Sequence, residues 1–284
     1  MTFREMMQTE KAWLAPAVFN PLCAKIAQHA GFELLYLGGG TLGYIKCGLE
    51  ANLNITELTQ AGIEIRAVCD LPLILDGAGG FGDPMHMHHV IPLAEAAGFC
   101  SIEIEDQVLP KRAHHHAGLE HMIPQELMAA KIREAVGARR SDDFLVIART
   151  NGVRASSMDD ALKRSEAYRA AGAEVIYIGV RNAEEMRYAG ERLGAPLMFS
   201  LPGESYKNLG LTLDEVARLG YRVISITTTQ LAFHRAMQQT YAAMFQGTPN
   251  PVMAGVTRKA EQEALHETLG FAALLEIEKA TVEK

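Results

Sequence analysis

The chain has little that would tie it to a membrane, to nucleic acid or to an oxidising compartment. No apolar run approaches the roughly 18 residues that a membrane span needs, and the net charge of −7 gives no reason to expect nucleic acid. The four cysteines form no C-x-x-C pair, and residues 1–5 lack the basic-then-apolar pattern of a secretory signal. We therefore expect a cytoplasmic protein with reduced thiols that binds neither nucleic acid nor membrane.

What is present is a repeated unit of helix, glycine and short apolar strand. Gly31, Gly98, Gly172 and Gly220 each stand between a helical pattern and a strand, where a left-handed glycine ends the helix and redirects the chain. The predicted strands cover residues 15–19, 34–37, 73–75, 102–105, 144–148, 175–178, 197–199 and 223–226. Most are apolar on both faces, as in a parallel sheet covered by helices. This alternation predicts one (β/α)₈ TIM barrel domain over residues 1–284.

The chain continues past the eighth predicted strand for longer than one barrel requires. A helical pattern covers residues 232–245, a Gly- and Pro-rich segment follows at 247–251, and a second helical pattern runs from about residue 258 to 284. We expect this C-terminal helical extension, about residues 250–284, to pack on a partner subunit.

The most informative segment is I-E-I-E-D-Q-V-L-P-K-R at residues 102–112. Apolar and acidic residues alternate in it with the period of a strand, so Glu103 and Glu105 point to the same side. The isoleucines point the other way, into a packed layer. Two carboxylates on one strand face are costly to bury unless a cation, a proton or a base compensates them. The segment therefore indicates a metal site or an acid-base site.

Other strand ends carry groups that suit an anion or a cation. The glycines at 38–40 allow backbone N–H groups to approach a carboxylate or phosphate, with a flexible turn as the alternative. Asp76 precedes a Gly-rich loop and suits Mg²⁺, unless it caps the turn that follows. Arg149 follows a buried apolar run and needs an anion, which is either a substrate carboxylate or an ion-pair partner such as Glu103 or Glu105.

Histidines gather in two places. His86 and His89 have the spacing of neighbours on one side of a helix, which is the arrangement of a metal pair. No third spaced ligand accompanies them, so surface or packing roles are favoured. The run at 114–116 is too compact for zinc-finger spacing, and one of its members can act as an acid or base when the loop closes.

Together these segments resemble the isocitrate lyase and phosphoenolpyruvate mutase superfamily. The motifs that carry the resemblance are N-P-L-C-A-K-I-A at 20–27, Y-L-G-G-G at 36–40, D-G-A-G-G-F-G at 76–82, I-E-D-Q-V-L-P-K-R at 104–112 and I-A-R-T-N at 147–151. The resemblance implies a TIM barrel whose C-terminal helix is swapped between subunits, usually in a homotetramer. It also implies Mg²⁺, with Mn²⁺ as a substitute, and a small 2-oxo or 2-hydroxy acid as substrate.

The resemblance also implies roles for individual residues. The expected metal ligands are Asp76 and Glu105, the expected substrate-binding residues are Tyr36, Gly38, Gly39, Gly40 and Arg149, and the expected catalytic residues are Lys111, His115 and Arg149. In these positions Mg²⁺ and Arg149 would stabilise the negative charge of an enolate oxygen.

Several positions depart from the family's pattern. Lyases of this family carry K-(K/R)-C-G-H on the loop after strand four, whereas Ala113 takes the place of the Cys here and His115 falls on the family's histidine. Ala78 replaces the second Asp of D-A-D, Asn52 stands where an Asp is common, and the Glu after strand six is replaced around Gly179. Glu103 is a candidate to replace the lost charge.

Three functions stay open on this pattern. The first is an Mg²⁺-dependent carbon–carbon lyase or decarboxylase that acts through an enolate. The second is a carbon–phosphorus bond enzyme of the phosphoenolpyruvate mutase or phosphonopyruvate hydrolase type. The third is a barrel that binds an organic acid without catalysis.

Overall fold

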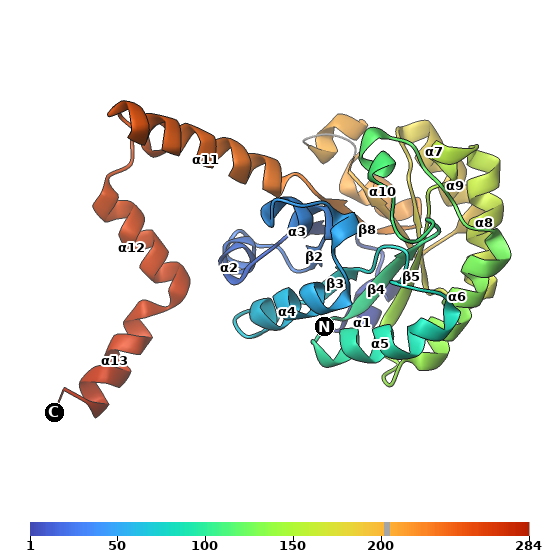
Figure 1. The fold of residues 1–284 in the computed structure, drawn as a ribbon, viewed down its shortest axis with the longest axis horizontal. Coiled ribbons are helices and arrows are strands. Elements are labelled where there is room, and N and C mark those ends of the chain that lie inside the picture. The colour runs from blue at the N-terminus through green and yellow to red at the C-terminus, as the bar shows by residue number, and fades with distance from the viewer. Residues whose placement is uncertain (202–204, 284) are drawn as a thin grey trace.

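Eight parallel strands form the centre of the molecule in the computed structural model, which describes residues 1–201 and 205–283. They are β1 (Trp13–Pro16), β2 (Leu35–Leu37), β3 (Leu73–Asp76), β4 (Ser101–Glu105), β5 (Leu145–Thr150), β6 (Val175–Ile178), β7 (Leu197–Ser200) and β8 (Tyr221–Ile226). The order in the sheet is β1-β8-β7-β6-β5-β4-β3-β2, and a bridge between Ala17 and Tyr36 brings its two edges together. The predicted (β/α)₈ barrel is therefore confirmed (Figure 1).

Helices connect successive strands and cover the outside of the barrel (Figure 1). They are α2 (Pro21–His29), α4 (Ile55–Arg66), α5 (Met87–Ala96), α6 (Gln125–Ala138), α8 (Met158–Ala170), α9 (Ala183–Leu193) and α10 (Leu213–Arg218), with short helices α3 (Gly39–Ile45) and α7 (Gly152–Ala155) directly after β2 and β5. The glycines at 31, 98, 172 and 220 have φ values of 93°, 84°, 109° and 94°, so the left-handed helix ends expected from the sequence are present.

The strands alternate between an inner and an outer apolar layer. Ile102 and Ile104 belong to the outer layer beneath the helices. Ile74 and Ile147 belong to the inner layer, which also receives Phe3 from α1 (Phe3–Gln8), the short helix at the amino ends of the strands. Two residues further along, the inward positions become polar, because Asp76 follows Ile74 and Arg149 follows Ile147. The barrel interior is thus apolar near α1 and charged at the carboxyl ends of the strands.

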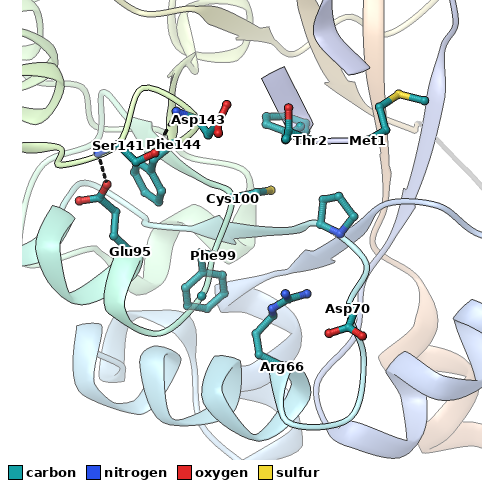
Figure 2. A pocket seen from close by; sticks show the side chains of 13 residues that line it. Met1, Thr2, Arg66, Asp70, Glu95, Phe99, Cys100, Ser141, Asp143 and Phe144 are labelled. Carbon is teal, nitrogen blue, oxygen red and sulfur yellow. Dashed lines mark hydrogen bonds between the residues drawn. The ribbon is translucent and has the colours of Figure 1, made fainter. Parts of the chain in front are cut away.

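A pocket of about 330 Å³ opens at the amino ends of β3, β4 and β5 (Figure 2). Two of its charged side chains bond to the neighbouring backbone: Arg66 donates to the carbonyls of Cys69 and Leu71, and Glu95 accepts from the N–H groups of Arg140 and Ser141. These contacts hold the loops below the barrel together. They do not assemble a set of groups that face one another across the pocket.

The C-terminal helices leave the barrel as an extended arm (Figure 1). The arm consists of α11 (Thr229–Gln246), α12 (Arg258–Leu269) and α13 (Phe271–Thr281). The helical pattern expected from about residue 258 onward is present as two helices, because Gly270 takes a φ of 69° and separates α12 from α13. Several large apolar side chains of the arm are exposed, among them Phe245 at 94%.

Two further features concern the chain as a whole. The cysteines at 23, 47, 69 and 100 are all free thiols. No helix in the part of the chain that the structure describes is long and apolar enough to cross a membrane.

Candidate active site

A cavity of about 300 Å³ lies at the carboxyl ends of the strands, where the inward residues are polar. Its lining includes Tyr36, Gly38, Gly40, Thr41, Tyr44, Glu50, Asp76, His115, His116, Arg149, Arg154, Tyr177, Ser200, Thr227 and Gln230. Strand register places buried carboxylates of β4 beside two of these residues: Asp76 on β3 lies opposite Glu103, and Arg149 on β5 lies opposite Glu105. Chemistry in barrels of this type is located at this end of the strands.

Arg149 joins the two carboxylates of β4. Its Nη1 donates to Glu103 Oε1 at 2.8 Å, and its Nε lies 3.4 Å from Glu105 Oε2. The guanidinium also stacks 4.7 Å from the ring centroid of Tyr177. The ion pairs that formed one of the two expectations for Arg149 are therefore present. Each uses one N–H group of the five in a guanidinium, so donors remain for a ligand in the cavity.

Glu103 lies deeper in the barrel than Glu105. Its other oxygen accepts a hydrogen bond from the Tyr36 hydroxyl at 2.9 Å, and the residue is completely buried. Burial raises the pKa of Glu103 to about 7, against the opposing positive charge of Arg149. Tyr36 thus contacts the carboxylate network while its side chain also lines the cavity.

Lys111 is the cation beside Glu105. Its Nζ donates to Glu105 Oε1 at 2.5 Å and to Glu50 Oε1 at 2.6 Å, and all three residues are buried. The second oxygen of Glu105 accepts from the Asn151 side-chain amide at 2.9 Å. Burial works to raise the pKa of Glu105, but the positive charges of Arg149 and Lys111 outweigh it and hold the pKa well below its ordinary value. Glu105 is therefore an ionised carboxylate.

Glu50 is a site residue that the sequence analysis did not identify, since the position considered there was Asn52. Asn52 instead accepts a hydrogen bond from the N–H of Leu49 in the turn around the short 3₁₀ helix η1 (Glu50–Asn52). Burial and the negative charge of Asp76 raise the pKa of Glu50 to about 8, with Lys111 opposing them. Together with Asp76, Glu103 and Glu105, Glu50 is thus a fourth buried carboxylate of the site.

Asp76 is held by backbone N–H groups on both of its oxygens. Oδ1 accepts from Ala78 at 3.1 Å, which is the turn-capping bond expected as the alternative to a metal role. Oδ2 accepts from Gly39 at 3.0 Å. The Gly39 N–H thus already has an acceptor within the protein, and a substrate-binding role for Gly39 stays a prediction. Gly38 and Gly40 line the cavity.

The histidines divide between the cavity and the surface. His115 and His116 line the cavity from the 3₁₀ helix η3 (Ala113–Ala117). His115 Nδ1 lies 2.9 Å from a carboxylate oxygen of Glu120, and His116 Nδ1 lies 2.9 Å from the Tyr44 hydroxyl. His86, His88 and His89 are exposed, and His88 Nε2 lies 2.8 Å from a carboxylate oxygen of Glu134. They are surface residues, as favoured above.

Asp106 completes the acidic segment but lies outside the cavity lining. Its carboxylate accepts hydrogen bonds from the Thr150 hydroxyl at 2.8 Å, the Asn151 N–H at 2.9 Å and the Tyr168 hydroxyl at 2.9 Å. These partners come from the end of β5 and from α8. Asp106 therefore fixes the loop after β5, including the residue whose side chain contacts Glu105.

The donor groups suit a hard divalent cation. Within residues 1–201 and 205–283, no group of three or more His, Cys, Asp or Glu side chains is arranged to hold a metal. Mg²⁺ does not require such a cage, because it binds one or two carboxylates and keeps several waters. The hydrogen bonds of Asp76 leave lone pairs free, and Lys111 demonstrates that a cation is stable beside Glu105. The residues present therefore fit Mg²⁺.

Comparison with known proteins identifies the family. Residues 3–245 match the model of the phosphoenolpyruvate phosphomutase family. The chain belongs to this family. The resemblance stated from the motifs is thus confirmed, and the match covers the barrel together with most of α11.

Individual relatives in this family carry out different reactions. The 2-methylisocitrate lyase of Aeropyrum pernix is 31% identical over 278 residues, which cover 95% of this chain and 87% of that protein. The oxaloacetate decarboxylase of Pseudomonas putida is 32% identical over 84% of this chain and 81% of that protein. A solved structure of phosphonopyruvate hydrolase in complex with oxalate and Mg²⁺ has a TM-score of 0.84 and 26% identity, with all of both chains covered.

Proposed function

We propose that this protein is an Mg²⁺-dependent lyase that cleaves a carbon–carbon bond, or removes CO₂, from a small 2-oxo or 2-hydroxy acid through an enolate. The observation that carries the proposal is the position of Arg149 between the buried carboxyl groups of Glu103 and Glu105 at the carboxyl ends of the strands. A cavity of about 300 Å³ suits a small acid, and relatives in the family act on molecules of this class according to their names.

Asp76 and Glu105 would hold the Mg²⁺, whose chemistry there is to stabilise negative charge on oxygen. The remaining N–H groups of Arg149 would bind a substrate carboxylate or the developing oxyanion, because a guanidinium matches both in geometry and charge. Tyr36 shapes the pocket beside Arg149. Gly40 lies in the first turn of α3, where backbone N–H groups have no acceptor within the helix and are available to a carboxylate. Mn²⁺ would substitute for Mg²⁺ because it accepts the same oxygen ligands.

Turnover of a panel of acids tests the proposal directly. Purified protein with Mg²⁺ is expected to release pyruvate or CO₂ from one of oxaloacetate, 2-methylisocitrate and 2,3-dimethylmalate, measured by coupled assay. Chelation is expected to lower the rate by about 100-fold or more, since a Lewis acid contributes several kcal/mol and about 1.4 kcal/mol is tenfold. Mn²⁺ added after chelation should restore it.

Two outcomes would redirect the assignment. Conversion of phosphonopyruvate, monitored by phosphorus NMR, would indicate carbon–phosphorus chemistry instead. The sequence does not favour this outcome, because Ala113 and the three histidines at 114–116 differ from the polar loop that the resemblance associates with such enzymes. Saturating Mg²⁺ binding without turnover on any of these substrates would leave a barrel that binds acids without catalysis.

We also propose that the C-terminal arm is exchanged between subunits of a homotetramer. The proposal is supported by the exposed apolar residues of α13, where Leu274 is 55% and Ile277 is 59% exposed. An isolated chain that leaves such a surface in water is unstable towards association, because burial of apolar area is favourable. The arm reaches well beyond the barrel of its own chain (Figure 1).

Charges introduced on α13 are expected to dissociate the assembly. Leu274→Glu with Ile277→Glu should convert a tetramer to smaller species, measured by size-exclusion chromatography with light scattering. The matched control is Glu276→Gln with Lys279→Gln, which removes an exposed ion pair of the same helix and should leave the tetramer intact. A monomeric wild-type protein at micromolar concentration would refute the proposal.

A further inference from the structure

Glu120, a carboxylate of the loop after β4, has no role in the proposed reaction. The side chain of Glu120 is fully buried, although Leu119 and His121 on either side of it are exposed. Burial of an ionised carboxylate is costly unless charged or hydrogen-bonding partners compensate it. The partners of Glu120 therefore indicate what the loop is built to hold.

Three side chains converge on this carboxylate. Its oxygens lie 2.9 and 3.1 Å from His115 Nδ1, and Oε1 lies 2.9 Å from Arg154 Nη1. The side-chain amide nitrogen of Gln107 also donates to it, and the same nitrogen lies 2.6 Å from His115 Nδ1. Burial works to raise the pKa of Glu120, but the hydrogen bond and charge of His115 and the charge of Arg154 outweigh it and lower the pKa. Glu120 is thus an anion at neutral pH.

This contact determines how the imidazole is presented. A carboxylate on Nδ1 fixes the ring orientation, favours a proton on that nitrogen and stabilises the imidazolium. Nε2 of His115 has no hydrogen-bond partner within the described ranges, and the ring lines the cavity. The other titratable or charged groups around the ring are His116, whose ring centroid is 5.4 Å away, and Arg154, with Lys111 and Tyr44 beyond His116.

We propose that Glu120 is a positioning residue that holds His115 as the proton donor of the reaction. The inference rests on the proposed function. It identifies which group donates the proton in a loop where Ala113 takes the place of the thiol. In the step, the Nε2–H bond of the imidazolium breaks and its proton bonds to the enolate carbon, where the enolate electron pair forms the new C–H bond. The ring remains neutral with Nδ1–H directed at Glu120, and it regains a proton from water.

Replacement of Glu120 by glutamine tests this role without relying on turnover. In Glu120→Gln the ¹⁵N resonances of the His115 ring, assigned by comparison with His115→Asn, are expected to shift away from those of a ring with its proton held on Nδ1, because that nitrogen loses its carboxylate acceptor. In the kinetic assay, kcat should fall with little change in KM, and its decline at high pH should begin at lower pH. His115→Asn should lose about 100-fold or more, as expected for removal of a general acid.

Two further variants keep the test decisive. Arg154→Met removes a positive charge but leaves the Glu120 carboxylate in place, so the ¹⁵N resonances of a ring with its proton held on Nδ1 should persist, in contrast to Glu120→Gln. His114→Gln alters an exposed neighbour in the same loop and should change neither quantity. Unchanged ¹⁵N resonances of the His115 ring in Glu120→Gln overturn the proposal, as does a loss of kcat without a change in the pH profile. If no substrate is turned over but the NMR shifts appear, the proposed function fails while the positioning of His115 by Glu120 stands.

Discussion

Replacement of Arg149 by methionine is expected to abolish measurable turnover and to lower the free energy of unfolding by about 3–5 kcal/mol. Both effects have the same origin. Glu103 and Glu105 are completely buried, and each loses a guanidinium contact in this variant. The rate should fall by about 100- to 1,000-fold from the loss of one preorganised charge at the oxyanion, with loss of substrate binding adding to it. Chemical denaturation and initial-rate assays measure the two quantities separately.

A second substitution separates stability from catalysis. Glu103→Gln in the Arg149→Met background removes a buried charge and keeps an acceptor for the Tyr36 hydroxyl, so most of the lost stability should return while the rate does not. Arg164→Met is the matched control, because Arg164 pairs with Asp106 outside the cavity and should affect stability without a selective loss of kcat. Wild-type turnover by Arg149→Met would remove Arg149 from the mechanism.

The stability loss in Arg149→Met should also depend on pH in a defined direction. Burial raises the pKa of Glu103 from 4.5 to about 7, so the folded state binds a proton that the unfolded state releases between these values. Stability from this group therefore falls as pH rises through that range. Without Arg149 the pKa rises further, and the deficit relative to wild type should be larger at pH 8 than at pH 6. An equal deficit at both values would contradict this account of Glu103.

The two-residue alternation of strands, together with the positions of the strand ends, was sufficient to predict which residues of the strands reach the site. The alternation at Glu103 and Glu105 places both carboxylates inside the barrel because a strand permits no other arrangement once its isoleucines are buried outside. The same alternation carries Asp76 and Arg149 to the cavity after the inward residues Ile74 and Ile147. These four positions depend on local geometry that sequence encodes directly.

Glu50 was not predictable in this way, because its place depends on how a turn folds back onto another element. A Cβ on Gly39 would lie 2.7 Å from Glu50 Cγ, and a Cβ on Gly43 would lie 2.7 Å from the Glu50 backbone nitrogen. Two glycines one helical turn apart on α3 therefore admit the segment that carries Glu50 into the site. The spacing G-x-x-x-G is visible in the sequence, but nothing in it specifies which later residue fills the space. The Glu120–His115 contact was unpredictable for the same reason, since it depends on how the loop after β4 folds back on itself.

Lys111 and a divalent cation are expected to compete for the same carboxylates, and Lys111→Met should reveal the competition. The ammonium lies within 2.6 Å of Glu50 and Glu105, so its removal leaves two buried carboxylates without that partner. In the presence of chelator the variant should lose about 3–5 kcal/mol of unfolding free energy. Mg²⁺ should restore much of this loss, because a ligand that binds only the folded state stabilises it by about 2.7 kcal/mol at 100 times its Kd.

Calorimetry should then show Mg²⁺ binding at least about tenfold more tightly to Lys111→Met than to wild type, since even about 1.4 kcal/mol of relieved charge repulsion gives that factor. Turnover should nevertheless fall, because the loop after β4 loses the side chain that joins it to Glu50 and Glu105. Arg112→Met is the matched control, because it removes an adjacent positive charge that is exposed. Salt screens exposed charges, so the Mg²⁺ affinity of this variant should stay within about twofold of wild type at the same ionic strength. Equal Mg²⁺ affinity in Lys111→Met and wild type would mean that Glu105 does not bind the cation, and the metal assignment would then rest on Asp76 without it.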